Sequence, residues 1–116
     1  METRNDRGHR VVITGAGLLT PIGLEVDTTW RALLAGTSGA APITLFEITP
    51  DYDVRFAAEV KGFQPENFME KKEAKRMDRF VQFAVMATHE ALRNSGLDLD
   101  KVDRTRVGVV IGSGIG

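Results

Sequence analysis

One arrangement occurs near both ends of the sequence: a short run rich in β-branched residues leads directly into a glycine-rich loop. The run 11–13 precedes the loop 14–17, and the run 107–111 precedes the loop 112–116. Nearly continuous apolar, β-branched residues are typical of strands that are covered on both faces of a sheet. We therefore expect two central strands of an α/β sheet, each ending in a tight turn.

The chain between these runs shows both helical and strand periodicities. Apolar residues at i, i+4, i+7 and i+8 predict a helix over 25–35, and Gly36 fits a left-handed residue at its end. Alternating side chains predict an edge strand over 55–60. A short helix is expected over 65–77, and a longer helix over 78–94 is expected between a capping aspartate and a terminating glycine.

The long helix carries two adjacent apolar stripes, a pattern typical of a helix that is buried over most of its circumference. One stripe contains Phe80, Phe83, Ala84, Ala87 and Ala91, and the other contains Val81, Val85, Thr88 and Leu92. Two central strands and one edge strand are too few to cover such a helix. We therefore expect an incomplete α/β layer over 11–116, preceded by a polar leader over 1–10 that should be disordered.

The glycine-rich loops also invite a nucleotide-binding interpretation, because glycine lets a backbone approach phosphate closely. Gly112 and Gly114 fit the start of a dinucleotide fingerprint, but the third glycine would fall beyond Gly116. The segment 14–23 is similar to the nucleotide loop of short-chain dehydrogenases, except that Leu19 stands where the second glycine is needed. Tight turns beside packed backbone are the favoured interpretation, and a dehydrogenase stays the least favoured alternative.

Charge and residue usage bear on several other classes of function. The 116 residues contain 15 lysines and arginines against 16 aspartates and glutamates, so the overall charge favours neither a nucleic acid nor a membrane as partner. There is no cysteine and no cluster of histidines and acids at metal-ligand spacing, so we expect neither a disulfide nor a metal site. Without a secretory leader or a membrane-length apolar run, a cytoplasmic location is the default expectation.

Four segments, in order, resemble the β-ketoacyl-acyl carrier protein synthases, and in particular the elongating, synthase II-like condensing enzymes of fatty acid biosynthesis. They are RVVITGAGLLTPIG, WRALLAGTSG, KKEAKRMDRF and RVGVVIGSGIG. Members of this family are several times longer. The resemblance therefore implies an N-terminal fragment, covering only the first part of the N-terminal half of a thiolase-like layered α/β/α fold. It also implies a homodimer of the full-length protein.

The same resemblance implies chemistry whose reactive groups lie outside this chain. In the family a cysteine thiolate accepts an acyl group, and two histidines assist decarboxylation of the malonyl thioester. Those three positions fall beyond the equivalent of Gly116, and neither His9 nor His89 matches one. We therefore expect no catalytic residue and no cofactor in this chain. A catalytically inactive relative, the chain-length partner of aromatic polyketide synthases, stays an alternative.

The resemblance also implies that a group of basic residues forms a docking surface. If the segment 65–77 is helical, Lys72, Lys75 and Arg76 fall on one side of it together with Arg79. The resemblance implies that the first three dock acyl carrier protein, the acidic partner that presents acyl and malonyl thioesters. The alternative is an ordinary solvated helix whose charges form local ion pairs.

The resemblance also assigns a role to the last glycine-rich loop, residues 112–116. The resemblance places Ile115, beside Gly114, at the wall of the acyl-chain tunnel, where side-chain bulk limits the length of the chain that enters. Plain packing beside a turn is the alternative.

Overall fold

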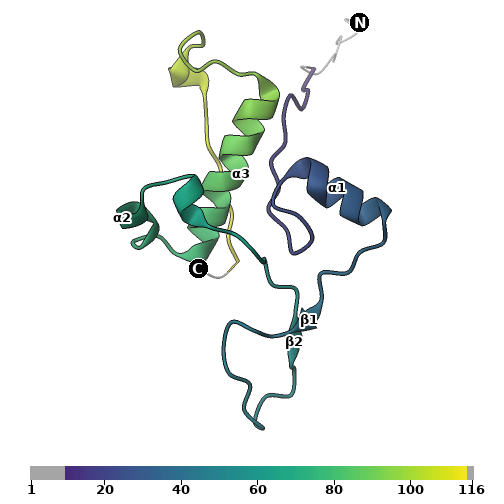
Figure 1. Ribbon diagram of the computed structural model, residues 1–116. Coiled ribbons are helices and arrows are strands. Elements are labelled where there is room, and N and C mark those ends of the chain that lie inside the picture. Colours follow the sequence, from purple (N-terminus) through teal and green to yellow (C-terminus); the bar gives the residue numbers. More distant parts are fainter. Residues whose placement is uncertain (1–9, 115–116) are drawn as a thin grey trace, which may run out of the picture.

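The computed structural model describes residues 10–114, which form helices and one small strand pair (Figure 1). The elements are α1 (Val26–Leu34), β1 (Ala41–Pro42), β2 (Phe56–Ala57), α2 (Lys71–Ala74) and α3 (Arg79–Ser95), with single 3-10 turns η1 (Pro65–Asn67) and η2 (Arg104–Arg106). The expectations for Ile115 and for residues 1–9 of the leader lie outside the described residues. None of the described helices is long and apolar enough to cross a membrane.

Both longer helices occur where the sequence predicts them. α3 follows Asp78, whose backbone is extended but whose side chain makes no capping hydrogen bond, and it ends at Gly96 with φ 65°. α1 ends at Ala35 and is followed by Gly36 with φ 66°. Glycine lacks a Cβ atom and adopts this left-handed backbone at low cost, which explains why both helices stop there.

The sheet differs from the expected one. β1 and β2 are antiparallel, with Ala41 opposite Ala57, so the edge strand expected over 55–60 is confirmed for two residues only. The expectation of central strands over 11–13 and 107–111 is wrong for the described chain, because neither run is paired with a strand. A strand exists through hydrogen bonds to a neighbouring strand, and residues 10–114 supply none for these two runs.

The segment 14–18 lies against α3, and its two glycines make this approach sterically feasible. A Cβ atom at Gly17 would lie 2.8 Å from the carbonyl carbon of Ala87, and one at Gly15 would lie 2.6 Å from the amide nitrogen of Ser95. Non-bonded carbon atoms prefer separations of about 3.5–4 Å, so no side chain fits at either position. These glycines therefore serve close backbone packing, which is the favoured interpretation of the loop.

A buried carboxylate on α3 holds the N-terminal part of the chain in place. Glu90 is 4% exposed. Its Oε2 atom accepts a hydrogen bond from the Leu18 amide at 2.8 Å, and its Oε1 atom accepts one from the Val26 amide, also at 2.8 Å. Val26 is the first residue of α1, where unpaired N–H groups favour a negative charge. Glu90 therefore joins the loop and α1 to α3.

A second buried carboxylate stabilises the turn after β1. Glu59 is 9% exposed and accepts hydrogen bonds from the Thr44 hydroxyl at 2.7 Å, the Thr44 amide at 3.0 Å and the Leu45 amide at 3.1 Å. These donors favour the charged carboxylate. They hold the pKa of Glu59 below its ordinary value, and the Thr44 hydroxyl has the largest effect.

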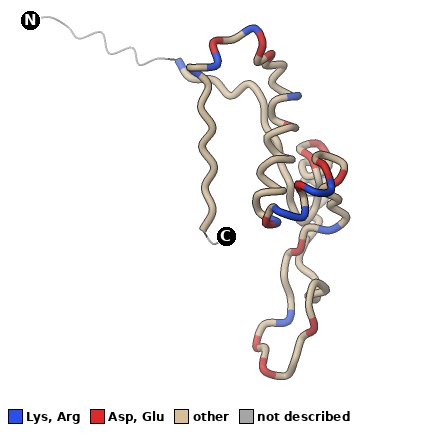
Figure 2. The backbone as a smooth tube through the Cα atoms, turned by 90° about the vertical axis from the view of Figure 1, so that its left-hand side faces the viewer, with Lys and Arg blue, Asp and Glu red and all other residues tan. Residues whose placement is uncertain are grey.

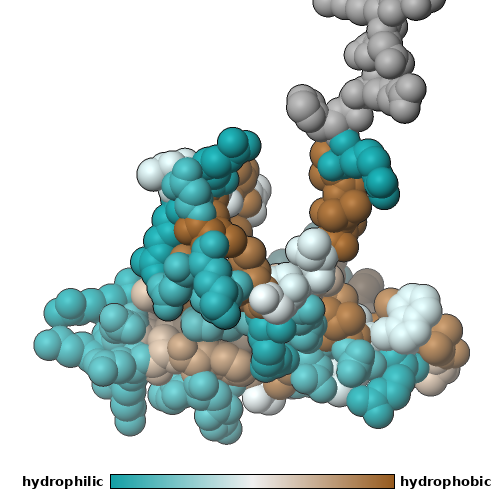
Figure 3. Space-filling view, turned by 90° about the horizontal axis from the view of Figure 1, so that it is seen from above, coloured by the Kyte–Doolittle hydropathy of each residue, from teal (hydrophilic) through white to brown (hydrophobic). Residues whose placement is uncertain are grey.

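Little of the apolar surface is buried. The buried apolar side chains in the described part of the chain are Phe63, Ala74 and Met86. On α3 only Met86 and Glu90 are buried, so the expectation that most of its circumference is covered is wrong here. Ile13 and Val110 are 91% and 96% exposed. Figure 3 shows apolar residues, in brown, exposed next to the grey N-terminal residues.

Candidate functional site

The basic residues singled out in the sequence lie on one short turn, residues 71–76, called here the basic turn. The expected helix over 65–77 is interrupted, because Glu70 is extended and only Lys71–Ala74 is α-helical. The turn tightens at its end, where the Arg76 amide donates to the Glu73 carbonyl oxygen at 2.9 Å, an i to i+3 bond.

This geometry gives the basic turn an inner and an outer side. Ala74 is 4% exposed and forms the inner side. Lys72, Lys75 and Arg76 are exposed, and the spacing of three and four residues places them on a common outer side. Figure 2 shows lysines and arginines, in blue, gathered near the start of α3. The structure therefore brings together the three residues that the sequence singled out.

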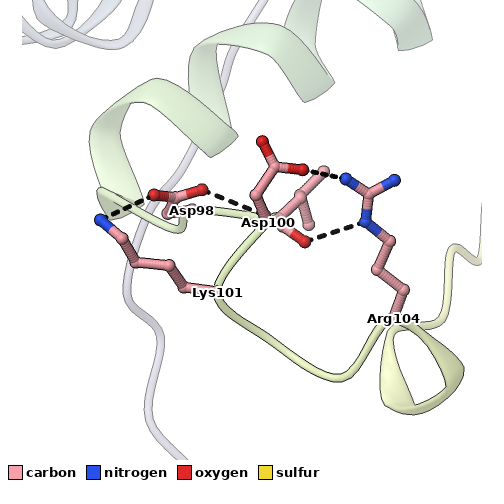
Figure 4. Close-up of polar contacts among 5 residues, drawn as sticks. Asp98, Asp100, Lys101 and Arg104 are labelled. Carbon is pink, nitrogen blue, oxygen red and sulfur yellow. Dashed lines mark hydrogen bonds and ion pairs between the residues drawn. The ribbon is translucent and has the colours of Figure 1, made fainter.

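The cations of the basic turn form no ion pair within the described residues, although Glu70 and Glu73 lie in the same stretch of chain. In the described part of the chain, ion pairs join Lys101 to Asp98 at 2.9 Å and Arg104 to Asp100, both in the loop that follows α3 (Figure 4). None involves residues 71–76. In the described residues the basic turn thus presents exposed cations that have no ion pair.

Arg79 does not extend this surface as the helical projection predicts. The extended backbone of Asp78, with ψ 155°, separates α2 from α3 and breaks the projection. The Arg79 guanidinium lies 5.0 Å from the ring centre of Phe83 and 5.9 Å from that of Phe63. Its Nη2 atom donates to the Val60 carbonyl oxygen at 3.0 Å. Arg79 therefore anchors the start of α3 through cation–π and hydrogen-bond contacts.

Of the two residues expected at an acyl pocket, Gly114 is described and is not enclosed. A Cβ atom at Gly114 would meet no atom within 4 Å, so the close backbone packing expected at this loop is not found at its described residues. Ile115 lies outside the described residues. An apolar cavity of about 510 Å³ does lie nearby, between α3 and the segment 109–113.

Both apolar stripes of the long helix contribute to the lining of this cavity, the first through Phe80 and Ala84. Val81, Val85, Thr88 and Leu92 line it from α3, and Val109 and Ile111 line it from the extended segment. The helical spacing of the four α3 residues is the signal by which the sequence indicates this surface, although it predicts packing and does not predict a cavity. No group of three or more metal-ligating side chains gathers within residues 10–114.

Comparison with known proteins identifies the family. Residues 8–116 match the family model described as "Beta-ketoacyl synthase, N-terminal domain". The chain is 49% identical over 108 residues to 3-oxoacyl-[acyl-carrier-protein] synthase 2 of Vibrio cholerae, and these cover 93% of this chain and 26% of that protein. It is 50% identical over 110 residues to the synthase 2 of Staphylococcus aureus strain COL, covering 95% and 26%.

A solved structure supports the same assignment. The chain superposes on the ishigamide ketosynthase/chain length factor with a TM-score of 0.69 and 36% sequence identity, over 78% of this chain and 22% of that chain. The chain thus spans about a quarter of the length of the curated relatives that it matches. On the family match over residues 8–116, the chain belongs to the β-ketoacyl synthase family and matches the model of its N-terminal domain.

Proposed function

We propose that the full-length protein containing this chain is an elongating 3-oxoacyl-acyl carrier protein synthase of fatty acid biosynthesis. The relatives at 49–50% identity are named 3-oxoacyl-[acyl-carrier-protein] synthase 2. The proposal includes acyl carrier protein, acyl thioesters and malonyl thioesters as partners, a homodimeric assembly and a cytoplasmic location. It also includes a layered thiolase-like α/β/α fold, in which the runs 11–13 and 107–111 pair with further strands.

In the proposed reaction, a cysteine thiolate attacks the acyl thioester and releases the carrier thiol. Malonyl thioester then loses carbon dioxide, and the resulting carbanion attacks the acyl-enzyme carbonyl, forming the new carbon–carbon bond and freeing the thiolate. This chain contains no cysteine, so the nucleophile is not among its residues. Its own contribution in this proposal is to dock the carrier and, through Gly114 and Ile115, to form part of the acyl pocket.

The single observation that carries the docking role is the unpaired positive charge of the basic turn. Lys72, Lys75 and Arg76 are exposed on one side of it, and no ion pair in the described residues occupies them. Such a surface attracts and orients an acidic partner through complementary potential. An acyl carrier protein with an acidic recognition helix and a phosphate-bearing prosthetic arm is such a partner.

The test of docking is a charge reversal in the full-length protein. Lys75→Glu should raise KM for acyl-carrier protein about three- to tenfold, because exposed charge pairs contribute roughly 0.2–1 kcal/mol each and reversal adds repulsion. The rate with a small acyl thioester that lacks the carrier should stay unchanged. Lys101→Glu, on the loop after α3, is the matched control and should leave both substrates unaffected. Equal KM values for acyl-carrier protein in the Lys75→Glu and Lys101→Glu variants would contradict the docking role.

The acyl-pocket part of the proposal has its own test. In the full-length protein, Ile115→Phe should lower kcat/KM for long acyl donors at least about tenfold relative to short ones, because a larger side chain in a packed wall costs about 1–3 kcal/mol when the chain must pass it. Relative values of kcat/KM for six-carbon and sixteen-carbon donors measure the effect. An unchanged ratio would mean that Ile115 packs elsewhere.

One observation keeps a second candidate function open. The solved structure at 36% identity is described as a ketosynthase/chain length factor. The same fold therefore also occurs in proteins that work with a chain length factor. The higher identity to synthase 2 favours the catalytic member. Mass spectrometry of the full-length protein with an acyl thioester separates the two, because the synthase acquires one acyl group on cysteine and a chain-length partner acquires none.

A further inference from the structure

The basic turn is too short to hold its own shape. α2 spans four residues, whereas isolated helices shorter than about 12–15 residues are marginal in water. It buries Ala74 only, and the extended backbone of Asp78 separates it from α3. Contacts with neighbouring elements therefore set the direction in which Lys72, Lys75 and Arg76 point.

Gln82, in the first turn of α3, supplies such a contact. Its Nε2 atom donates to the carbonyl oxygens of Ala74, at 2.8 Å, and Met77, at 3.2 Å. Both neighbours are acceptors, so the amide nitrogen with its two hydrogens satisfies them and the amide oxygen cannot. Ala74 and Met77 flank Lys75 and Arg76 in the chain. One side-chain amide thus holds the backbone on both sides of these two cations.

We propose that Gln82 is a positioning residue for carrier-protein docking, because its side-chain amide fixes the backbone conformation in which the basic turn presents its cations. This inference rests on the proposed docking function of the turn. Gln82 carries no charge, so it acts by preorganising the surface and thereby reduces the ordering cost of binding. The attraction itself still comes from Lys72, Lys75 and Arg76.

The experiment compares variants of the full-length protein. Gln82→Met keeps the length of the side chain and removes both donors. It should raise KM for acyl-carrier protein about three- to tenfold, because a hydrogen bond between uncharged groups contributes a net free energy of about 0.5–1.5 kcal/mol. The rate with a carrier-free acyl thioester should change less than twofold. Gln64→Met, at an exposed glutamine before η1, is the matched control and should behave like the unmodified protein.

Two further readouts separate positioning from charge and from general stability. The slope of log KM against log salt concentration should fall in Lys75→Ala, which removes a cation, and should persist in Gln82→Met, which does not. Amide hydrogen exchange at Arg76 and Met77 should accelerate in Gln82→Met. If that variant does not fold, Gln82→Leu also removes the donors without adding a charge and should give the same result.

The outcomes are distinguishable. If Lys75→Ala raises KM for acyl-carrier protein and Gln82→Met does not, the positioning role is overturned and the docking function stands. If neither variant changes KM, the docking function fails as well. If Gln82→Met lowers activity equally with acyl-carrier protein and with the carrier-free thioester, Gln82 is merely structural and the inference is overturned.

Discussion

At the scale of single residues, the described chain depends on buried carboxylates that receive backbone and hydroxyl hydrogen bonds. Glu90 joins two distant segments to α3, and Glu59 closes the turn after β1. A buried carboxylate is costly unless its oxygens are satisfied, and here each oxygen of both side chains has a donor. The sequence shows both residues, yet no periodicity distinguishes them from solvated glutamates, because their partners lie 14 to 72 residues away.

The lowered pKa of Glu59 predicts a pH dependence. A carboxylate whose pKa is lower in the folded state contributes stability above its unfolded pKa of about 4.5, and loses that contribution as the pH falls through the folded value. The full-length protein should therefore melt at a higher temperature than its Glu59→Gln variant at pH 7, and the difference should shrink as the pH falls below about 5. A melting-temperature difference that is constant from pH 7 to pH 4 would show that the charge of Glu59 is not what stabilises the turn.

At the scale of elements, the two longer helices could be predicted from the sequence, whereas the break in the segment 65–77 and the sheet could not. Apolar spacing and a following glycine locate α1 and α3 because both signals are local. Strands need partners, and the runs 11–13 and 107–111 have the composition of buried strands without a pairing strand in residues 10–114. The strand propensity of a segment therefore indicates that it can pair with another strand. It does not indicate whether that other strand is present.

The candidate site shows the same division between local and distant signals. Lys72, Lys75 and Arg76 could be grouped from their spacing, because three and four residues make one helical turn. The sequence could not predict that Arg79 lies apart from the surface of the basic turn, because this depends on the extended backbone of Asp78. The role of Gln82 was likewise hidden, because its two acceptors are backbone carbonyls and every residue provides one.

At the scale of the whole molecule, the chain leaves much of its apolar surface without a partner. Four side chains of the two strand-like runs, Val11, Ile13, Val109 and Val110, are between 75% and 96% exposed. Contiguous apolar surface of this kind, on segments with unpaired backbone, promotes association with other strands. In the full-length relatives, which are about four times longer, additional chain is available to cover it.

The isolated polypeptide 1–116 should therefore self-associate. Size-exclusion chromatography with light scattering should give a mass above that of the monomer at micromolar concentration, because the exposed strand-like runs pair between copies. Val110→Lys should raise the concentration of half-association about tenfold, since burying one valine contributes roughly 1.5 kcal/mol and a lysine opposes edge pairing. Val54→Lys, at a residue 58% exposed on the loop between β1 and β2, is the matched control and should change little. A monomer that unfolds in one sharp cooperative transition would contradict the prediction, because it would require these apolar runs to be buried within a single copy of the chain.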